Sequence, residues 1–121
     1  FLVTMLSLEN QQALCVAARK FRNLLPFGCW WFLNNPSLVD SVTRMRLEML
    51  GTSFVPQHSD ARILDQLIYK WVHTRETLSR VLIDKYTALA KTGWPLTEKS
   101  LQQDVFNLLE GNFSRWVAGV H

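Results

Sequence analysis

The sequence lacks the features that would assign a function at once. No apolar run approaches the ~20 residues that a membrane-spanning helix needs. Thirteen scattered Lys and Arg exceed the ten Asp and Glu by only three, a balance that does not favour nucleic acid. There is also no Gly-rich phosphate loop, paired-cysteine zinc motif, HxH pair or nucleophile elbow. A membrane protein, a nucleic-acid binder and a self-contained hydrolase are therefore not expected.

Cysteine is also scarce. The two cysteines, Cys15 and Cys29, lie in apolar surroundings and form neither a CxxC pair nor a disulfide framework. Free cysteine is among the most buried residue types, so we expect reduced, buried thiols in a cytoplasmic protein. The apolar start at 1–6 has neither the basic region nor the small-residue cleavage site of a signal peptide.

The composition is that of a packed domain. The 121 residues are 48% apolar and 19% charged, a profile typical of a globular protein rather than a disordered tail. The chain opens inside an apolar run without an initiator methionine, so we expect it to be part of a longer protein.

The first half alternates between strand and helix signals. Continuous apolarity, typical of strands covered on both faces, predicts strands at about 1–6, 27–33 and 53–58. One-sided apolar spacing predicts crossover helices at 8–21 and 36–50. The expected helix signals are Ser7 as the first cap, Asn35 or Ser37 with Pro36 at the second start, and Gly51 as its stop. This order indicates parallel βαβ units.

The second half shows only helical spacing, at 64–72, 76–91 and 98–109. Gly93 and Gly111 are the expected stops, and Thr97 is the expected cap of the last helix.

These patterns predict an α/β fold that is only part of a larger one. Three parallel strands with two crossovers keep two open edges, which a closed barrel removes. We therefore expect residues 1–63 to form a partial parallel barrel, the end of a closed barrel. Residues 64–121 would then be C-terminal helices packed on the barrel, not an independent domain. Catalytic residues of such barrels follow the strands, here at 7–10, 30–35 and 58–62.

Five side chains in those places could carry chemistry. His58, Asp60 and Arg62 would share one face of an extended segment and could serve as metal ligand, proton carrier and anchor for an anionic substrate. The alternative is that Asp60 caps the next helix and Arg62 is its ion-pair partner. Trp30 and Trp31 could stack on a sugar ring or belong to the core, on opposite faces of a strand.

Two motifs together resemble the uronate isomerase family. The motif at 27–34 reads FGCWWFLN, and one helix later the motif at 59–62 reads SDAR. These are glucuronate isomerases of the amidohydrolase superfamily, with a (β/α)8 barrel and extra helices. The resemblance implies that this chain supplies the last three βα units of that (β/α)8 barrel, strands six to eight with their helices, and the C-terminal helical extension. It also implies reversible aldose–ketose isomerisation, of D-glucuronate to D-fructuronate and of D-galacturonate to D-tagaturonate.

The resemblance also implies residue roles. Asp60 would be the carboxylate of the last strand, near or bound to a divalent metal such as zinc or manganese, and would carry a proton between C1 and C2. Arg62 would hold the anionic or hydroxyl end of the substrate, and Trp30 rather than Trp31 would line the pocket. The family's metal-binding histidines lie on earlier strands, so the isolated chain is expected to be inactive. The implied partners are a sugar acid and the remainder of the barrel, with a homo-oligomer as a further option.

One loop departs from the family, and a second class of function stays open. Family members place an arginine just after the sixth strand, where this chain has Ser7-Leu8-Glu9-Asn10, so no substrate contact is assigned to 7–10. The second class is a non-catalytic helical protein-interaction module whose stable body begins at Leu64. Parallel pairing of the three strands, with Asp60 and Arg62 at their C-terminal edge, would favour the barrel. An all-helical structure would exclude it.

Overall fold

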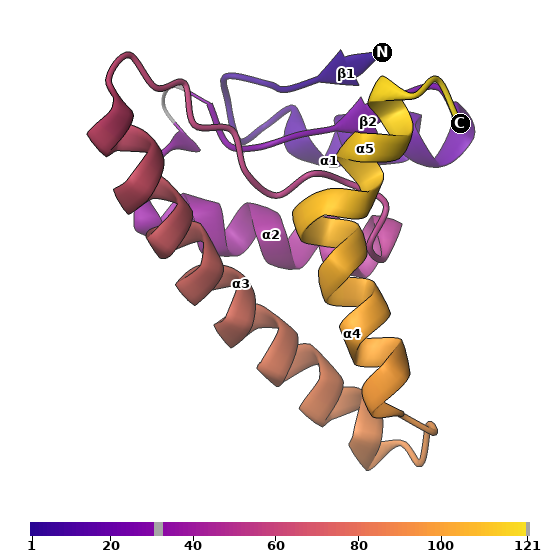
Figure 1. Ribbon diagram of the computed structural model, residues 1–121. Helices are drawn as coiled ribbons and strands as arrows, with labels where there is room; N and C mark the ends of the chain where they lie inside the picture. The colour runs from indigo at the N-terminus through magenta and orange to yellow at the C-terminus, as the bar shows by residue number, and fades with distance from the viewer. Residues whose placement is uncertain (31–32, 121) are drawn as a thin grey trace.

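The computed structural model describes residues 1–30 and 33–120 and shows a small parallel sheet with helices around it (Figure 1). The strands and helices are β1 (Leu2–Val3), α1 (Gln11–Lys20), β2 (Leu25–Pro26), α2 (Pro36–Leu50), α3 (Leu64–Lys91), α4 (Glu98–Phe106), the π-helical η2 (Asn107–Gly111) and α5 (Asn112–Val117). In Figure 1, α3 and the column from α4 to α5 meet at the far end of α3 and diverge toward the strands. None of the described helices is long and apolar enough to cross a membrane.

The strand segments are parallel neighbours in chain order. Leu2 lies opposite Leu25 in the β1–β2 pair, and Phe27 forms a parallel bridge with Val55. The Val55 N–H donates to the carbonyl of Pro26 at 3.0 Å. Parallel pairing is as predicted, and the structure is not all-helical.

The strands are shorter than predicted, and one is displaced. Those expected at 1–6 and 53–58 reduce to β1 and to the bridge at Val55. The strand expected at 27–33 is wrong, because pairing runs through 25–27 and the chain leaves the sheet at Gly28. The apolarity that follows reflects burial instead, since Cys29 and Leu33 form a core cluster with Val39 and Val42 of α2. Trp31 and Phe32 lie outside the described residues.

The two crossover helices differ in how well their starts were predicted. In α2 the Asn35 side chain accepts a hydrogen bond from the Leu38 N–H at 3.2 Å, Pro36 is the first residue, and Gly51 ends the helix with a φ of 60°. α1 begins three residues later than predicted, after Asn10, so Ser7 as its cap is wrong. The Ser7 hydroxyl instead accepts a hydrogen bond from the Asn10 side chain at 3.1 Å, within the loop before the helix.

The later helices are more continuous than predicted. The helices predicted at 64–72 and 76–91 form one continuous helix, α3, which the polar residues between them do not interrupt. One of these residues, Thr74, is buried, and its hydroxyl donates to the Gln57 side chain at 2.7 Å. Thr97 caps α4, as predicted, and forms a capping box with Ser100. Gly111 as a stop is wrong, because it has helical dihedrals and the chain continues into α5. A Cβ at Gly111 would lie 2.9 Å from the ring of Phe106, so close packing explains this glycine.

A second core cluster joins the two halves of the chain. Phe54, in the segment before the Val55 bridge, is fully buried against Leu78 and Leu82 of α3 and Leu108 of η2. The Asn112 side chain donates to the carbonyl of Phe54 at 2.9 Å. The helices after Leu64 therefore pack directly on the strand segment that precedes the candidate site.

Candidate active site at the strand ends

The turn after β2 is shaped by Gly28, which has a φ of 51°. A Cβ at this position would lie 2.0 Å from the Cβ of His58 and 2.7 Å from its backbone nitrogen. Only glycine fits both the left-handed conformation and so close an approach. The turn after β2 is therefore in direct contact with the segment that follows Val55. Sequence reasoning used Gly28 only as part of a motif and missed this role.

Two of the predicted site residues meet across this contact. The indole N–H of Trp30 donates to Oδ2 of Asp60 at 3.3 Å, although the residues are thirty positions apart. Trp30 is half-buried and Asp60 is exposed. Asp60 does not cap α3, because the N-cap position is Ile63, which makes no side-chain cap bond. The capping alternative for Asp60 is therefore wrong.

The shared face expected for His58, Asp60 and Arg62 is not formed. It required an extended segment, but Asp60 has a φ of 45°, which turns the chain. Asp and Asn adopt this region more easily than most non-glycine residues. Arg62 is exposed, and its backbone N–H donates to the Gln66 side chain at 2.7 Å. Within 1–30 and 33–120 its guanidinium has no ion-pair partner, so the Asp60–Arg62 pair is not observed.

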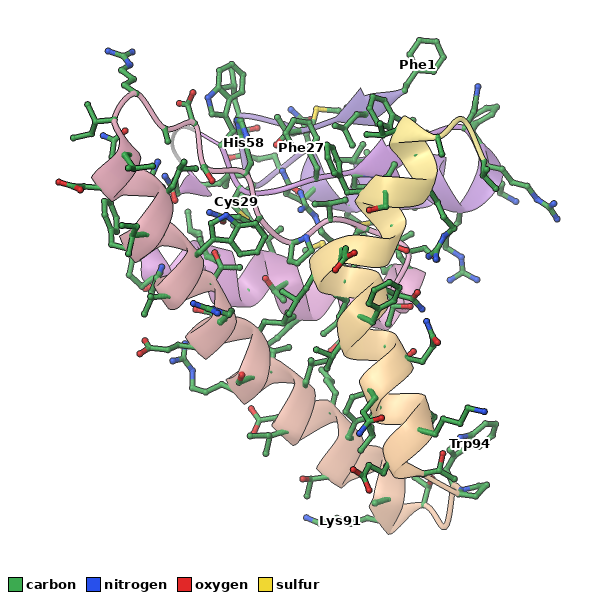
Figure 2. The ribbon with its side chains drawn as sticks, viewed as in Figure 1. Phe1, Phe27, Cys29, His58, Lys91 and Trp94 are labelled. Carbon is green, nitrogen blue, oxygen red and sulfur yellow. The ribbon has the colours of Figure 1, made fainter. Side chains whose placement is uncertain are left out.

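His58 belongs to an aromatic cluster behind Asp60. Its ring meets Phe27 edge to face at 4.9 Å and Trp30 at 6.4 Å between ring centroids, and Figure 2 shows His58 beside Phe27. Burial lowers the pKa of the imidazole below its usual value, an effect that nearby Asp60 opposes and Lys70 reinforces. A neutral, packed His58 supports the turn that carries Asp60.

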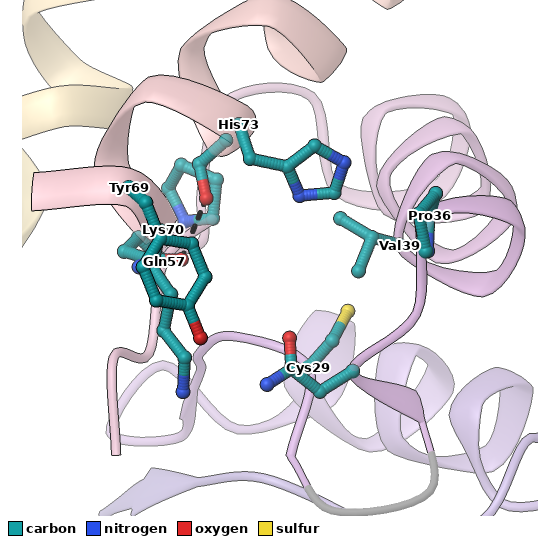
Figure 3. Close-up of a pocket in the computed structure, with 10 residues that line it drawn as sticks. Cys29, Pro36, Val39, Gln57, Tyr69, Lys70 and His73 are labelled. Atoms are coloured by element: carbon teal, nitrogen blue, oxygen red, sulfur yellow. Dashed lines mark hydrogen bonds between the residues drawn. The ribbon is translucent and has the colours of Figure 1, made fainter. Parts of the chain in front are cut away.

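A cavity of about 270 Å³ lies beside these turns, between the start of α2 and α3 (Figure 3). It is lined by Cys29, Asn34, Pro36, Val39, Pro56, Gln57, Tyr69, Lys70, His73 and Thr74. The Lys70 ammonium group donates to the carbonyl of Ser59, which links α3 to the segment before Asp60. Asp60 and Arg62 do not line this cavity, so it is separate from the predicted site. The i, i+3 spacing of Lys70 and His73 is the signal that could have indicated their shared face.

Both cysteines are free and buried, as predicted, and Cys29 lines the cavity. Burial raises the pKa of both thiols, an effect that nearby Arg46 partly opposes. The uncharged thiol form is therefore favoured at neutral pH.

The described residues do not complete a metal site. No three His, Cys, Asp or Glu side chains among them are close enough to hold an ion. Asp60 is a suitable oxygen ligand, but one exposed carboxylate is too few for a divalent cation. Its role as a metal ligand remains a prediction.

The parallel strands, the crossover helices and the polar turns that follow them define a segment of an α/β protein whose candidate site lies at the strand ends. Among solved structures, the chain is similar to a uronate isomerase from Bacillus halodurans C-125, with 59% sequence identity and a TM-score of 0.93. The similarity covers 98% of this chain and 28% of that one. No family model and no curated protein matches the chain. The chain therefore matches one segment of a uronate isomerase, the family that its two motifs resemble.

Proposed function

We propose that this chain forms one wall of a uronate isomerase active site within a complete (β/α)8 barrel. The reaction would interconvert aldose and ketose sugar acids, D-glucuronate with D-fructuronate and D-galacturonate with D-tagaturonate. The observation that carries the proposal is the contact of Trp30 with Asp60 at the ends of parallel strands, in a chain 59% identical to a uronate isomerase.

Open strand edges support the barrel. Among the described residues, β1 pairs only with β2, and Val55 is bridged only to Phe27. Apolar side chains at the start of α3 also face solvent, with Leu64 71% exposed and Ile68 61% exposed. A closed barrel pairs such edges, and a larger protein would cover such side chains. We therefore propose that the chain contributes the last three βα units and the helices that follow.

The contact with Trp30 suits Asp60 to carry the proton. Isomerisation removes a proton from C2 of the open-chain aldose and returns one to C1, and a carboxylate held over the two carbons can do both. The indole N–H holds Oδ2, so we assign proton transfer to the other oxygen, Oδ1. Because the hydrogen bond at Oδ2 orients the whole carboxylate, Oδ1 loses less freedom when the substrate binds.

Arg62 suits the anionic end of the substrate. Its planar guanidinium matches a carboxylate with two parallel hydrogen bonds, which favours a sugar acid over a neutral sugar. It lies two residues after Asp60 and is exposed, so substrate could reach it.

The metal, the partners and the compartment belong to the proposal as well. We propose that Asp60 is one ligand of a divalent ion, zinc or manganese, whose other ligands lie outside this chain. The proton steps above use only residues of this chain. Inactivity of the isolated chain, assembly into a homo-oligomer and a cytoplasmic location are further predictions.

Turnover by the full-length enzyme with Asp60→Asn tests the function. Asparagine keeps the shape and the Trp30 contact but cannot accept the proton, so kcat should fall by roughly 10²–10⁴-fold while the melting temperature changes little. The matched control is Asp65→Asn, an exposed acidic residue in the first turn of α3, which should leave kcat unchanged. Near-normal turnover with Asp60→Asn would refute the assignment.

A further inference from the structure

Arg46, in α2, is a buried cation without an acidic partner. Its side chain is only 1% exposed, and no carboxylate within 1–30 and 33–120 pairs with it. Nη1 donates to the carbonyl of Gly28 at 2.7 Å, and Nη2 donates to Oε1 of Gln11 at 2.8 Å. Burial lowers the pKa of the guanidinium.

Stability alone does not explain a buried, unpaired guanidinium. Burying a charge without an opposite charge costs free energy that neutral hydrogen bonds only partly offset. An apolar side chain of similar volume would often fill the same space at no loss of stability. The positions of the hydrogen-bond partners are therefore a better guide to the role of Arg46 than its burial.

Those partners reach the turns after all three strand segments. Gln11 is fully buried, and its Nε2 donates to the carbonyl of Ser7, in the loop after β1, at 3.3 Å. The Gly28 carbonyl belongs to the turn after β2, two residues before Trp30. The α-carbon of Gly28 lies against His58, in the segment after Val55.

Building on the proposed function, we propose that Arg46 is a positioning residue for Asp60. Its guanidinium fixes the Gly28 carbonyl and thereby the turn that presents the Trp30 indole to the Asp60 carboxylate. Arg46 does not touch the reacting atoms. Because Arg62, the proposed substrate anchor, is not part of this hydrogen-bond network, a displaced network should impair the chemical step more than substrate binding.

The test uses the full-length enzyme with Arg46→Met, which keeps much of the volume but removes both hydrogen bonds. We expect kcat to fall about 10²-fold, as for a displacement of about 1 Å, with KM for the uronate changed less than about threefold. Arg46→Lys keeps one donor and should recover most of the loss. The control is Arg44→Met on the same helix, whose guanidinium pairs with Asp40 on the surface and should not affect kcat.

Several outcomes would overturn the proposal. A folded Arg46→Met enzyme with normal kcat, or an equal loss with Arg44→Met, would do so. If Arg46→Met does not fold, kcat of Arg46→Lys and of Gln11→Met is measured in its place. If none of the three variants folds, the network has only a structural role and the proposal is overturned. Asp60→Asn, measured in parallel, separates the two proposals. Normal turnover by Asp60→Asn contradicts the proposed function. Loss of turnover with Asp60→Asn, together with normal turnover by Arg46→Met, contradicts only the role of Arg46.

Discussion

At the scale of single residues, the candidate site depends on one hydrogen bond between two parts of the chain. Trp30 and Asp60 come from the turns after β2 and after Val55, and the indole N–H holds one carboxylate oxygen. Asp60 also has a φ of 45°, a conformation that costs energy for a residue with a Cβ. A carboxylate on strained backbone that is also held by a neighbouring turn is consistent with the catalytic role proposed for it.

Replacing Trp30 with phenylalanine removes the hydrogen bond but keeps an aromatic ring at this position. Because the N–H donates to an exposed carboxylate, its loss should reduce kcat by about tenfold while KM changes little. Steady-state kinetics of the full-length enzyme would measure this. Trp94→Phe is the control, since Trp94 is exposed in the loop between α3 and α4. An unchanged kcat with Trp30→Phe would mean that the bond does not position Asp60.

Arg62→Lys tests the substrate anchor. Lysine keeps the charge but cannot form two parallel hydrogen bonds with a carboxylate, so KM for the uronate should rise roughly tenfold. The melting temperature should stay the same, because the side chain is exposed. Arg75→Lys, an exposed change on α3, provides the comparison. If KM is the same for both variants, Arg62 does not bind the substrate carboxylate.

Trp30 and Asp60 could be selected from the sequence, but their contact could not. Both belong to motifs that resemble a family, and Trp30 lies within, and Asp60 just after, an apolar run that suggests a buried strand. The shared face expected for His58, Asp60 and Arg62 assumed extended backbone. Aspartate tolerates a positive φ better than most residues, but its presence alone does not predict the φ of 45° at Asp60.

At the scale of elements, the turn after β2 positions the site. Gly28 combines a left-handed backbone with the closest approach of His58, and the Arg46 guanidinium holds its carbonyl. The turn is therefore fixed from both sides. A change at Gly28 should disturb the site more than a change at any glycine whose surroundings are open.

Gly28→Ala and Gly51→Ala separate contact from conformation. Both positions have positive φ, so each substitution should cost about 1–2 kcal/mol of unfolding free energy from backbone strain. Only at Gly28 does the new Cβ collide with another residue, 2.0 Å from the Cβ of His58, whereas nothing lies within 4 Å at Gly51. We expect Gly28→Ala to be at least about 2 kcal/mol more destabilising in denaturant titrations. Equal destabilisation would contradict the close contact between the two turns.

Elements were predicted best where their signals are local. The start of α2 follows from Asn35 and Pro36, whose capping and φ preferences act within one turn. The strand at 27–33 was misplaced because continuous apolarity reports burial, which an irregular turn packed on α2 also provides. Gly111 was misread because a glycine can also permit close packing inside a helix.

At the scale of the whole molecule, the candidate site lies at strand ends whose outer edges are open. It spans 28% of the Bacillus halodurans uronate isomerase to which it is similar. Within its described residues the outer strand edges are unpaired, and Phe1 points away from the molecule in Figure 2. The sequence predicts these open edges from the number of strands, but it does not show what pairs with them.

The most direct measurement is the isomerase activity of a chimera in which this chain replaces the matching segment of the Bacillus halodurans enzyme. The 59% identity and close agreement in fold lead us to expect a folded chimera that interconverts D-glucuronate and D-fructuronate. The same chimera with Asp60→Asn should lose that activity, because the proton carrier is gone. A folded chimera without isomerase activity, or one whose activity survives Asp60→Asn, would contradict the assignment of this chain as the wall of a uronate isomerase site.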